Sequence, residues 1–202
     1  MASSRPVILY LHGFGSSGAS GTVQMLRKHL MDFEVVAPDI PIDPAEALPY
    51  LKGLCASLNP VLVMGQSMGG MYALQMKGTM RLCINPSLNM SKMSHVLKMG
   101  KFTYSCKRSD GVQSVFITHD IIEHYRSVEE HLFDDVTEED ELFCYGLFGS
   151  EDKVVNCYDL FASHFPESRY IKAGHTIDDH VLVREVIPVI RELLPSQEPK
   201  YY

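Results

Sequence analysis

Short apolar runs alternate with longer amphipathic segments along the chain. The runs lack a regular apolar–polar alternation, which is typical of strands that are buried on both faces of a parallel sheet. They predict about six core strands, at Val7–Leu11, Glu34–Ala37, Val61–Met64, Leu82–Ile84, Leu142–Phe148 and Arg169–Lys172. The segments between them predict helices at Gly21–Met31, Pro44–Leu58, Met68–Gly78 and Cys157–His164, and a last helix that runs to Leu194 and is started or kinked by Pro188. This order predicts a doubly wound, mostly parallel α/β sheet in one domain over residues 1–202.

The interval between the strands at Leu82–Ile84 and Leu142–Phe148 is far longer than a simple crossover requires. Within it, Asp110-Gly111 lies between two strand-like runs and predicts a β-hairpin. The predicted parts of the interval are strand-like runs at Lys101–Lys107 and Val112–Thr118, a helix from His119 to Phe133 and an acidic stretch at Val136–Glu141. We interpret residues 87–141 as an inserted lid or cap.

The stretch Gly65-Gln66-Ser67-Met68-Gly69-Gly70 lies between a predicted strand and a predicted helix. It has the form G-x-S-x-G in the strand–turn–helix context of a nucleophile elbow. The glycines Gly65 and Gly69 leave room for the sharp turn, and the helix N-terminus favours negative charge near the serine. We therefore predict Ser67 as a catalytic nucleophile and the N–H of Met68 as an oxyanion donor.

A serine nucleophile needs a histidine base, and the base needs a carboxylate. In this type of fold the chain order is serine, acid, histidine. Asp152 follows the strand at Leu142–Phe148 and is predicted as the acid in preference to Glu151; the alternative is a charge that only caps a helix N-terminus. His175 follows the last strand and is predicted as the base, while His180 is expected in the closing helix.

The loop after the first strand also contains a glycine pattern. Gly13, Gly15 and Gly18 spell G-x-G-x-x-G, and Asp39 lies near the position of a ribose-binding acid, as in a dinucleotide-binding turn. An oxidoreductase would leave the G-x-S-x-G motif and its predicted partners without a role, and the Tyr-x-x-x-Lys pair of short-chain dehydrogenases is missing. We predict instead that the N–H of Phe14 is the second oxyanion donor, with His12 fixing the loop.

Net charge, the lengths of apolar runs and the spacing of cysteines and histidines argue against several other classes of protein. The net charge of −7 gives no support for nucleic-acid binding. No apolar run approaches the roughly 20 residues of a membrane span, and the N-terminus does not have the pattern of a signal peptide. The 5 cysteines form no C-x-x-C pair, so we expect reduced thiols and a cytoplasmic protein. The 9 histidines show no metal-ligand spacing, so no metal is expected.

Motifs along nearly the whole chain resemble those of the α/β-hydrolase superfamily, and within it the chain is similar to the small bacterial YqiA-like esterases. The residues that carry this resemblance are Leu11-His12-Gly13-Phe14, Ser16-Ser17, Pro44–Ala47, Gly65–Gly70, Asn85-Pro86, Asp152 and Gly174-His175. The resemblance implies an esterase or thioesterase that acts on acyl esters without a cofactor. The chain departs from the family pattern at Gln66, within the elbow, and in the details of the insertion.

Together these features predict a serine hydrolase that cleaves small-molecule carboxylic esters or thioesters through a covalent acyl-enzyme. Two alternatives stay open, a non-catalytic binding protein that retains the fold and an acyltransferase with the same triad. The apolar side chains of the insertion either line an acyl pocket or pack on the core; they are Met90, Met93, Val96, Leu97 and Met99. The sequence leaves the oligomeric state open.

Overall fold

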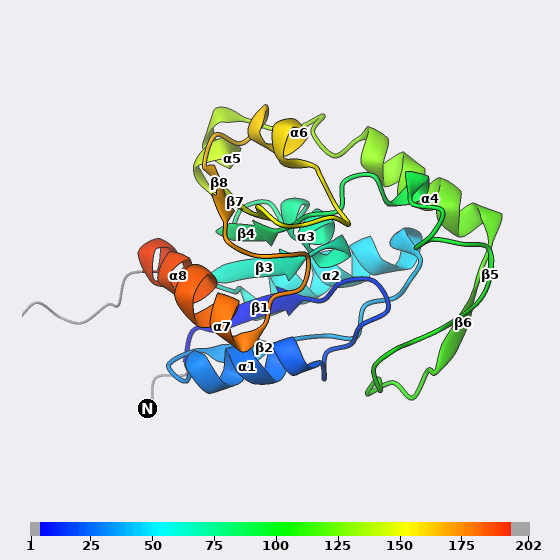
Figure 1. The fold of residues 1–202 in the computed structure, drawn as a ribbon, viewed down its shortest axis with the longest axis horizontal. Helices are drawn as coiled ribbons and strands as arrows, with labels where there is room; N and C mark the ends of the chain where they lie inside the picture. The colour runs from blue at the N-terminus through cyan, green and yellow to red at the C-terminus, as the bar shows by residue number, and fades with distance from the viewer. Residues whose placement is uncertain (1–4, 195–202) are drawn as a thin grey trace, which may run out of the picture.

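The computed structural model describes residues 5–194, and a six-stranded sheet forms its centre (Figure 1). All neighbouring strands in this sheet are parallel, in the order β2-β1-β3-β4-β7-β8. The strands are β1 (Val7–Leu11), β2 (Glu34–Val36), β3 (Leu62–Gln66), β4 (Arg81–Ile84), β7 (Cys144–Gly149) and β8 (Ser168–Ile171). The predicted doubly wound α/β fold is thus confirmed.

Helices cover both faces of the sheet. Successive side chains along each strand point to opposite faces, so each strand contributes to the packing on both. In β1, Ile8 and Tyr10 belong to one buried cluster, and Leu9 and Leu11 belong to the other. The first cluster packs on α1 (Gly21–His29), the turn α7 (Asp179–Val181), the π-helix η2 (Leu182–Val186) and α8 (Ile187–Leu193). The second packs on α2 (Pro44–Leu58), α3 (Met68–Leu74) and α6 (Tyr158–Ala162).

The last helical region is not one regular helix. Pro188 lies at the start of α8, directly after the π-helix η2. A proline lacks the N–H that a regular helical bond needs, so the expected interruption is found at this residue.

The acidic stretch before β7 differs from its prediction, because it forms the helix α5 (Glu138–Leu142). The side chain of Thr137 caps α5 by accepting from the Asp140 N–H, and acidic residues are favoured in a first turn.

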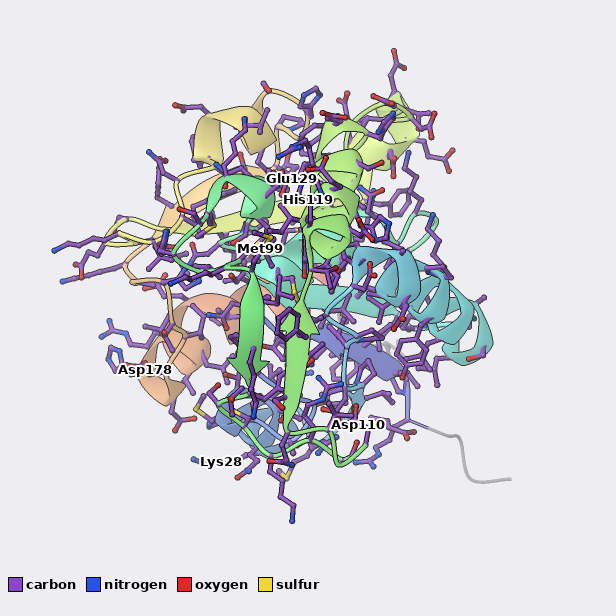
Figure 2. The ribbon with its side chains drawn as sticks, turned by 90° about the vertical axis from the view of Figure 1, so that its right-hand side faces the viewer. Lys28, Met99, Asp110, His119, Glu129 and Asp178 are labelled. Carbon is purple, nitrogen blue, oxygen red and sulfur yellow. The ribbon has the colours of Figure 1, made fainter. Side chains whose placement is uncertain are left out.

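Residues 87–141 contain η1 (Met90–Lys92), the antiparallel pair β5 (Gly100–Thr103) and β6 (Ser114–Ile117), α4 (His119–Glu130) and α5. The arrows of β1 and β3 point toward the side of the molecule where β5 and β6 lie (Figure 1). Seen from that side, the hairpin runs from Met99 and His119 at its base to Asp110 at its far end (Figure 2). The paired strands are shorter than predicted, since much of the connecting loop bonds to the rest of the protein instead of to itself.

A buried ion pair fixes the end of this segment to the sheet. Arg81 of β4 is fully buried; its Nη1 donates to the Leu74 carbonyl oxygen at 2.8 Å, and its Nη2 donates to the backbone and carboxylate oxygens of Asp140. Lys77 Nζ lies 3.3 Å from the other carboxylate oxygen. Two charged groups can stay out of water here because each is paired with the opposite charge or with a carbonyl.

Replacing Arg81 with alanine should therefore destabilise the protein strongly, because the carboxylate of Asp140 would remain buried with only Lys77 beside it. We expect Arg81→Ala to lower the free energy of unfolding by about 3 kcal/mol in urea denaturation. Arg126→Ala is the matched control, since its ion pair with Glu123 is exposed and should contribute less than about 1 kcal/mol. Equal effects of the two substitutions would contradict this view of Arg81.

Candidate active site

Ser67 lies at the sharp turn between β3 and α3, with φ 57° and ψ −122°. This conformation is strained for any residue other than glycine. The flanking backbone is packed so closely that side chains would not fit. A Cβ atom on Gly65 would lie 2.1 Å from the Gly69 carbonyl oxygen, and one on Gly69 would lie 1.9 Å from the Leu11 carbonyl oxygen.

The close packing around the elbow glycines can be tested by replacing two glycines that lie in helices. Gly69→Ala should lower the free energy of unfolding by about 3 kcal/mol, because the new methyl group would meet backbone that has no room to shift. Gly53→Ala in α2 should instead raise it by about 0.5 kcal/mol, since no atom lies within 4 Å of the added Cβ. Thermal denaturation of both variants measures the contrast, and a harmless Gly69→Ala would show that the elbow is less tightly packed.

Three side chains form a continuous hydrogen-bonded series from the elbow. Ser67 Oγ lies 3.1 Å from His175 Nε2, and His175 Nδ1 lies 2.8 Å from Asp152 Oδ2. The second oxygen of Asp152 accepts from the N–H groups of Val154 at 2.7 Å and Val155 at 3.1 Å. Only 2% of the Asp152 side chain is exposed, so the carboxylate faces the imidazole and the backbone donors instead of solvent.

The two competing residues lie elsewhere. Glu151 is exposed beside Asp152. His180 is exposed on α7, where its Nε2 is 3.5 Å from Arg184 Nη1. The structure thus brings Ser67, Asp152 and His175 together and leaves Glu151 and His180 outside this series.

Two side-chain amides hold the backbone around His175. Gln66 Nε2 donates to the His175 carbonyl oxygen at 2.7 Å. Asn85 Nδ2 donates to the carbonyl oxygens of Gly174 at 3.0 Å and His175 at 3.3 Å, and its Oδ1 accepts from the Gly149 N–H at 2.7 Å. Sequence reasoning missed these roles. The available signal was that Gln66 ends β3 and Asn85 directly follows β4, since the carboxyl ends of parallel strands meet at one edge of the sheet.

The backbone groups predicted as oxyanion donors are free of other partners. Within residues 5–194, neither the N–H of Phe14 nor that of Met68 donates to a protein acceptor. The loop that carries Phe14 lies against the serine, since a Cβ on Gly13 would be 3.3 Å from Ser67 Cβ. Both N–H groups are therefore available to a ligand, as an oxyanion hole requires.

His12 holds this loop in place through both ring nitrogens. Its Nδ1 lies 2.9 Å from the Gly13 carbonyl oxygen, which can only accept, so Nδ1 carries the proton. Its Nε2 then accepts from the Ile40 N–H at 3.1 Å. Burial lowers the pKa of His12, which favours the neutral imidazole that this arrangement needs.

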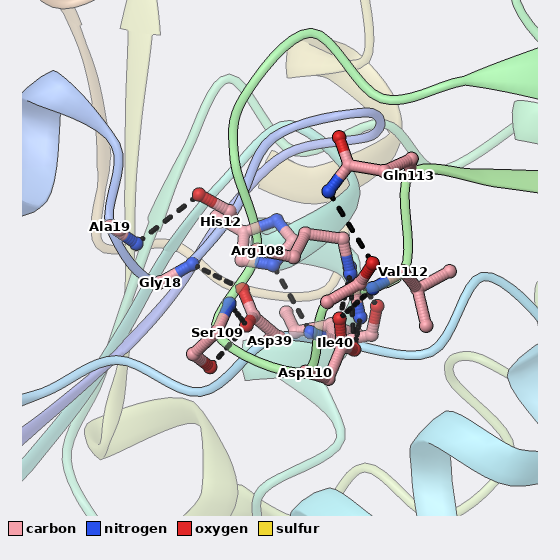
Figure 3. A network of polar contacts seen from close by, with 12 residues as sticks. His12, Gly18, Ala19, Asp39, Ile40, Arg108, Ser109, Asp110, Val112 and Gln113 are labelled. Atoms are coloured by element: carbon pink, nitrogen blue, oxygen red, sulfur yellow. Dashed lines mark hydrogen bonds and ion pairs between the residues drawn. The ribbon is translucent and has the colours of Figure 1, made fainter.

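The glycine pattern of the loop has conformational causes. Gly15 has φ +73°, and a Cβ on Gly18 would lie 2.1 Å from the Ala37 carbonyl oxygen. The Asp39 carboxylate, which resembled a ribose-binding acid in the sequence, bonds to protein groups instead. It accepts from the Gly18 N–H at 2.9 Å and from both the N–H and the hydroxyl of Ser109 in the hairpin loop (Figure 3).

Further contacts bind the hairpin loop to the same region. Arg108 Nη1 donates to the Ile40 carbonyl oxygen at 3.1 Å (Figure 3). The N–H and the hydroxyl of Ser105 donate to the Gly15 carbonyl oxygen at 3.1 and 2.9 Å. The ring of Phe102 packs on that of Phe14, with centroids 4.7 Å apart. The hairpin is thus attached to the loop that carries the predicted oxyanion donor.

Asp39 makes this attachment dependent on pH. Desolvation raises the pKa of Asp39, but hydrogen bonds from Ser109 and Gly18 outweigh it and hold the pKa below its ordinary value of 3.8. A carboxylate with a depressed pKa stabilises the fold above the pKa of the unfolded chain, and this contribution is lost as the pH falls through the folded pKa. The attachment should therefore persist at neutral pH and weaken below pH 3.8.

Protease sensitivity of the loop tests this prediction. At neutral pH, Asp39→Ala should increase trypsin cleavage at the exposed Lys107 by about tenfold, because the loop opens more often. Asp32→Ala, which removes an exposed ion pair with Arg191, should leave cleavage unchanged. With pepsin, the difference between wild type and Asp39→Ala should shrink as the pH falls below 3.8. A difference that is constant with pH would contradict the assignment to this carboxylate.

A cavity of about 340 Å³ opens beside Ser67 and His175. One group of lining residues is apolar and comprises Phe14, Met90, Met93, Val96 and Val154. A second group is polar and comprises Tyr10, Ser16, Thr22, Gln66, Ser87 and Thr176. Of the apolar residues singled out in the insertion, Met90, Met93 and Val96 line this cavity, whereas Leu97 is in the core and Met99 is 60% exposed.

No group of three or more His, Cys, Asp or Glu side chains in residues 5–194 is arranged to hold a metal ion. In the same range, every helix is too short or too polar to cross a membrane.

Comparison with known proteins now identifies the family. The profile of the uncharacterised protein family UPF0227 matches residues 7–125. The chain belongs to UPF0227. The match covers the elbow, the glycine loop and most of the inserted segment, and it confirms the resemblance to the YqiA-like proteins of the α/β-hydrolase superfamily.

Solved structures with the same fold include several ester hydrolases. Est1E from Butyrivibrio proteoclasticus is 11% identical with a TM-score of 0.67, over 96% of this chain and 90% of that one. A monoglyceride lipase from Saccharomyces cerevisiae is 14% identical with a TM-score of 0.63, over 96% and 87%. The thioesterase domain from the curacin biosynthetic pathway is 14% identical with a TM-score of 0.58, over 94% and 91%. At these identities the similarity establishes the α/β-hydrolase fold.

Proposed function

We propose that this protein hydrolyses carboxylic esters or thioesters of small molecules through a covalent acyl-enzyme on Ser67. The observation that carries the proposal is the unbroken series from Ser67 Oγ through His175 to Asp152, with links of 3.1 and 2.8 Å. A serine hydroxyl becomes a useful nucleophile only when a base accepts its proton, and the base works best when a carboxylate fixes its tautomer. The strained backbone at Ser67 is also typical of nucleophile elbows.

Acylation begins when His175 Nε2 takes the proton of Ser67 Oγ as this oxygen attacks the substrate carbonyl carbon. The carbonyl π-bond breaks and its electron pair moves to the oxygen, which the N–H groups of Phe14 and Met68 stabilise. The C–O or C–S bond to the leaving group then breaks. His175 gives its proton to the departing alcohol or thiol, and Asp152 stabilises the imidazolium in the interval.

Deacylation repeats these steps with water as the nucleophile. His175 Nε2 takes a proton from water as its oxygen attacks the acyl carbon, and the same two N–H groups stabilise the oxyanion. The bond from carbon to Ser67 Oγ breaks, and His175 returns the proton to Ser67. The carboxylic acid leaves, and the site is restored.

The surroundings of Ser67 support a small-molecule substrate. The cavity of about 340 Å³ is at the small end of the range for ligand pockets. We assign residues 87–141 as a cap in one domain that spans the chain, since Met90, Met93 and Val96 supply apolar lining. The neighbours named as a monoglyceride lipase and a thioesterase domain are consistent with acyl transfer to water.

The two other hypotheses make different predictions. A binding protein that only retains the fold would have Ser67 Oγ outside the reach of every histidine, whereas here the distance is 3.1 Å. An acyltransferase would use the same residues and pass the acyl group to an alcohol other than water. Product analysis with an added alcohol distinguishes it from a hydrolase.

Active-site labelling tests the proposal. Wild-type protein should react with a fluorophosphonate probe and hydrolyse p-nitrophenyl esters of graded acyl length. Ser67→Ala should abolish labelling, and Ser67→Ala and His175→Ala should each lower kcat/KM by about 10⁴-fold or more, because each removes part of the unit that transfers the proton.

His180→Ala is the control, since this histidine is exposed and lies outside the series. It should keep wild-type labelling and turnover. Ester hydrolysis that survives in Ser67→Ala would refute the proposed nucleophile.

A further inference from the structure

A second serine hydroxyl lies beside the one at the elbow. Ser87 Oγ is 3.1 Å from Ser67 Oγ, and Ser87 is one of the residues that line the cavity. Its side chain is fully buried. Among the hydrogen bonds within residues 5–194, Ser67 Oγ is the sole partner of this hydroxyl. No sequence motif pointed to Ser87 as a site residue.

The direction of this hydrogen bond follows from the rest of the series. In the neutral imidazole that a general base requires, Nδ1 carries the single proton, because the Asp152 carboxylate can only accept from it. Nε2 is then an acceptor, and the Ser67 hydroxyl must donate to it. Ser67 Oγ has no second proton to give, so the Ser87 hydroxyl donates to Ser67 Oγ.

The backbone holds Ser87 in this position. The Ser87 N–H donates to the Ser67 carbonyl oxygen at 3.1 Å. Two residues earlier, Asn85 has φ 43°, which turns the chain across the elbow after β4. Between them, Pro86 packs so closely on α3 that a Cβ on Gly70 would be 3.0 Å from Pro86 Cα. The fold therefore fixes the contact between the two hydroxyls through the main chain.

We propose that Ser87 is a further catalytic residue, whose hydroxyl stabilises the negative charge on Ser67 Oγ as the acyl-enzyme breaks down. The proposal rests on the hydrolase function proposed above. When water has attacked, the bond between the acyl carbon and Ser67 Oγ breaks, and its electron pair goes to Oγ. His175 delivers the proton to Oγ, and Ser87 donates a hydrogen bond throughout and transfers no proton.

The hydrogen bond should accelerate deacylation more than acylation. In the acyl-enzyme, Ser67 Oγ is the ether-type oxygen of an ester, which is a poor acceptor, and it becomes alkoxide-like as it leaves. In the free enzyme, Oγ is a hydroxyl oxygen that already accepts well, so less is gained when it attacks. Only the difference between ground state and transition state changes a rate, and this difference is larger for the departure of Ser67.

Pre-steady-state kinetics with p-nitrophenyl acetate separate the two steps, because release of nitrophenol reports acylation and the following steady state reports deacylation. For Ser87→Ala we expect a steady-state rate about tenfold lower, with a burst rate within about threefold of wild type. As a result, kcat and KM should fall together while kcat/KM changes little. A purely structural role for Ser87 would lower the burst rate or the burst amplitude as well.

Two further variants complete the experiment. Ser87→Gly also removes the hydroxyl and should give the same kinetics as Ser87→Ala. Agreement between the two variants would assign the effect to the lost hydroxyl and not to a packing defect in one of them. Ser91→Ala is the matched control, since the Ser91 hydroxyl bonds to Glu129 in the same segment and not to Ser67; both kinetic phases should stay at wild-type values.

The outcomes distinguish the two proposals. An unchanged steady-state rate in Ser87→Ala, or equal slowing of both phases, would overturn the role of Ser87 while leaving the hydrolase intact. If wild-type protein shows neither a burst nor turnover with any ester, the proposed function itself fails.

Discussion

The conformation of Ser67 is the constraint on which the rest of the site depends. A non-glycine residue in such a region costs about 1–3 kcal/mol, and it persists only where the surroundings determine it. Here the Ser67 N–H donates to the Ile84 carbonyl oxygen at 3.0 Å, and the Ser67 carbonyl oxygen accepts from Gly70 and Ser87. The end of β3 is held by both its neighbour β4 and the start of α3, so the backbone conformation of the elbow is fixed from two sides.

The same edge of the sheet supplies the partners of that serine. Gln66 ends β3 and Asn85 directly follows β4, and the amides of these two side chains hold the backbone of His175. The loop after β7 carries Asp152, which is fixed by the N–H groups of Val154 and Val155. Pre-organisation of this kind matters because a base and a nucleophile must meet within hydrogen-bonding distance before chemistry starts. The hairpin contributes to this pre-organisation, because hydrogen bonds attach the hairpin to the loop that carries Phe14 and to Asp39. The hairpin does not stand apart as a separate lid.

Much of the architecture could be predicted because it rests on local patterns. The runs around β1 and β3 are apolar because both faces of the sheet are covered, and the glycines around Ser67 follow from its turn. Boundaries were less predictable where tertiary contacts decide them. The hairpin strands are shorter than their apolar runs, because Ser105, Arg108 and Ser109 bond to other loops. α5 was missed because a capped acidic turn has little apolar periodicity.

The sequence by itself determined the strand–turn–helix unit at Ser67 and the chain order of Asp152 and His175, because these depend on spacing along one chain. Only the tertiary structure decided which carboxylate faces which imidazole, and that Asp39 bonds to Ser109 instead of serving as a ligand-binding acid. It also placed Ser87 against Ser67. The physical reason is that these contacts join the ends of different strands and loops, and their side chains become neighbours only when the parallel sheet aligns those ends at one edge.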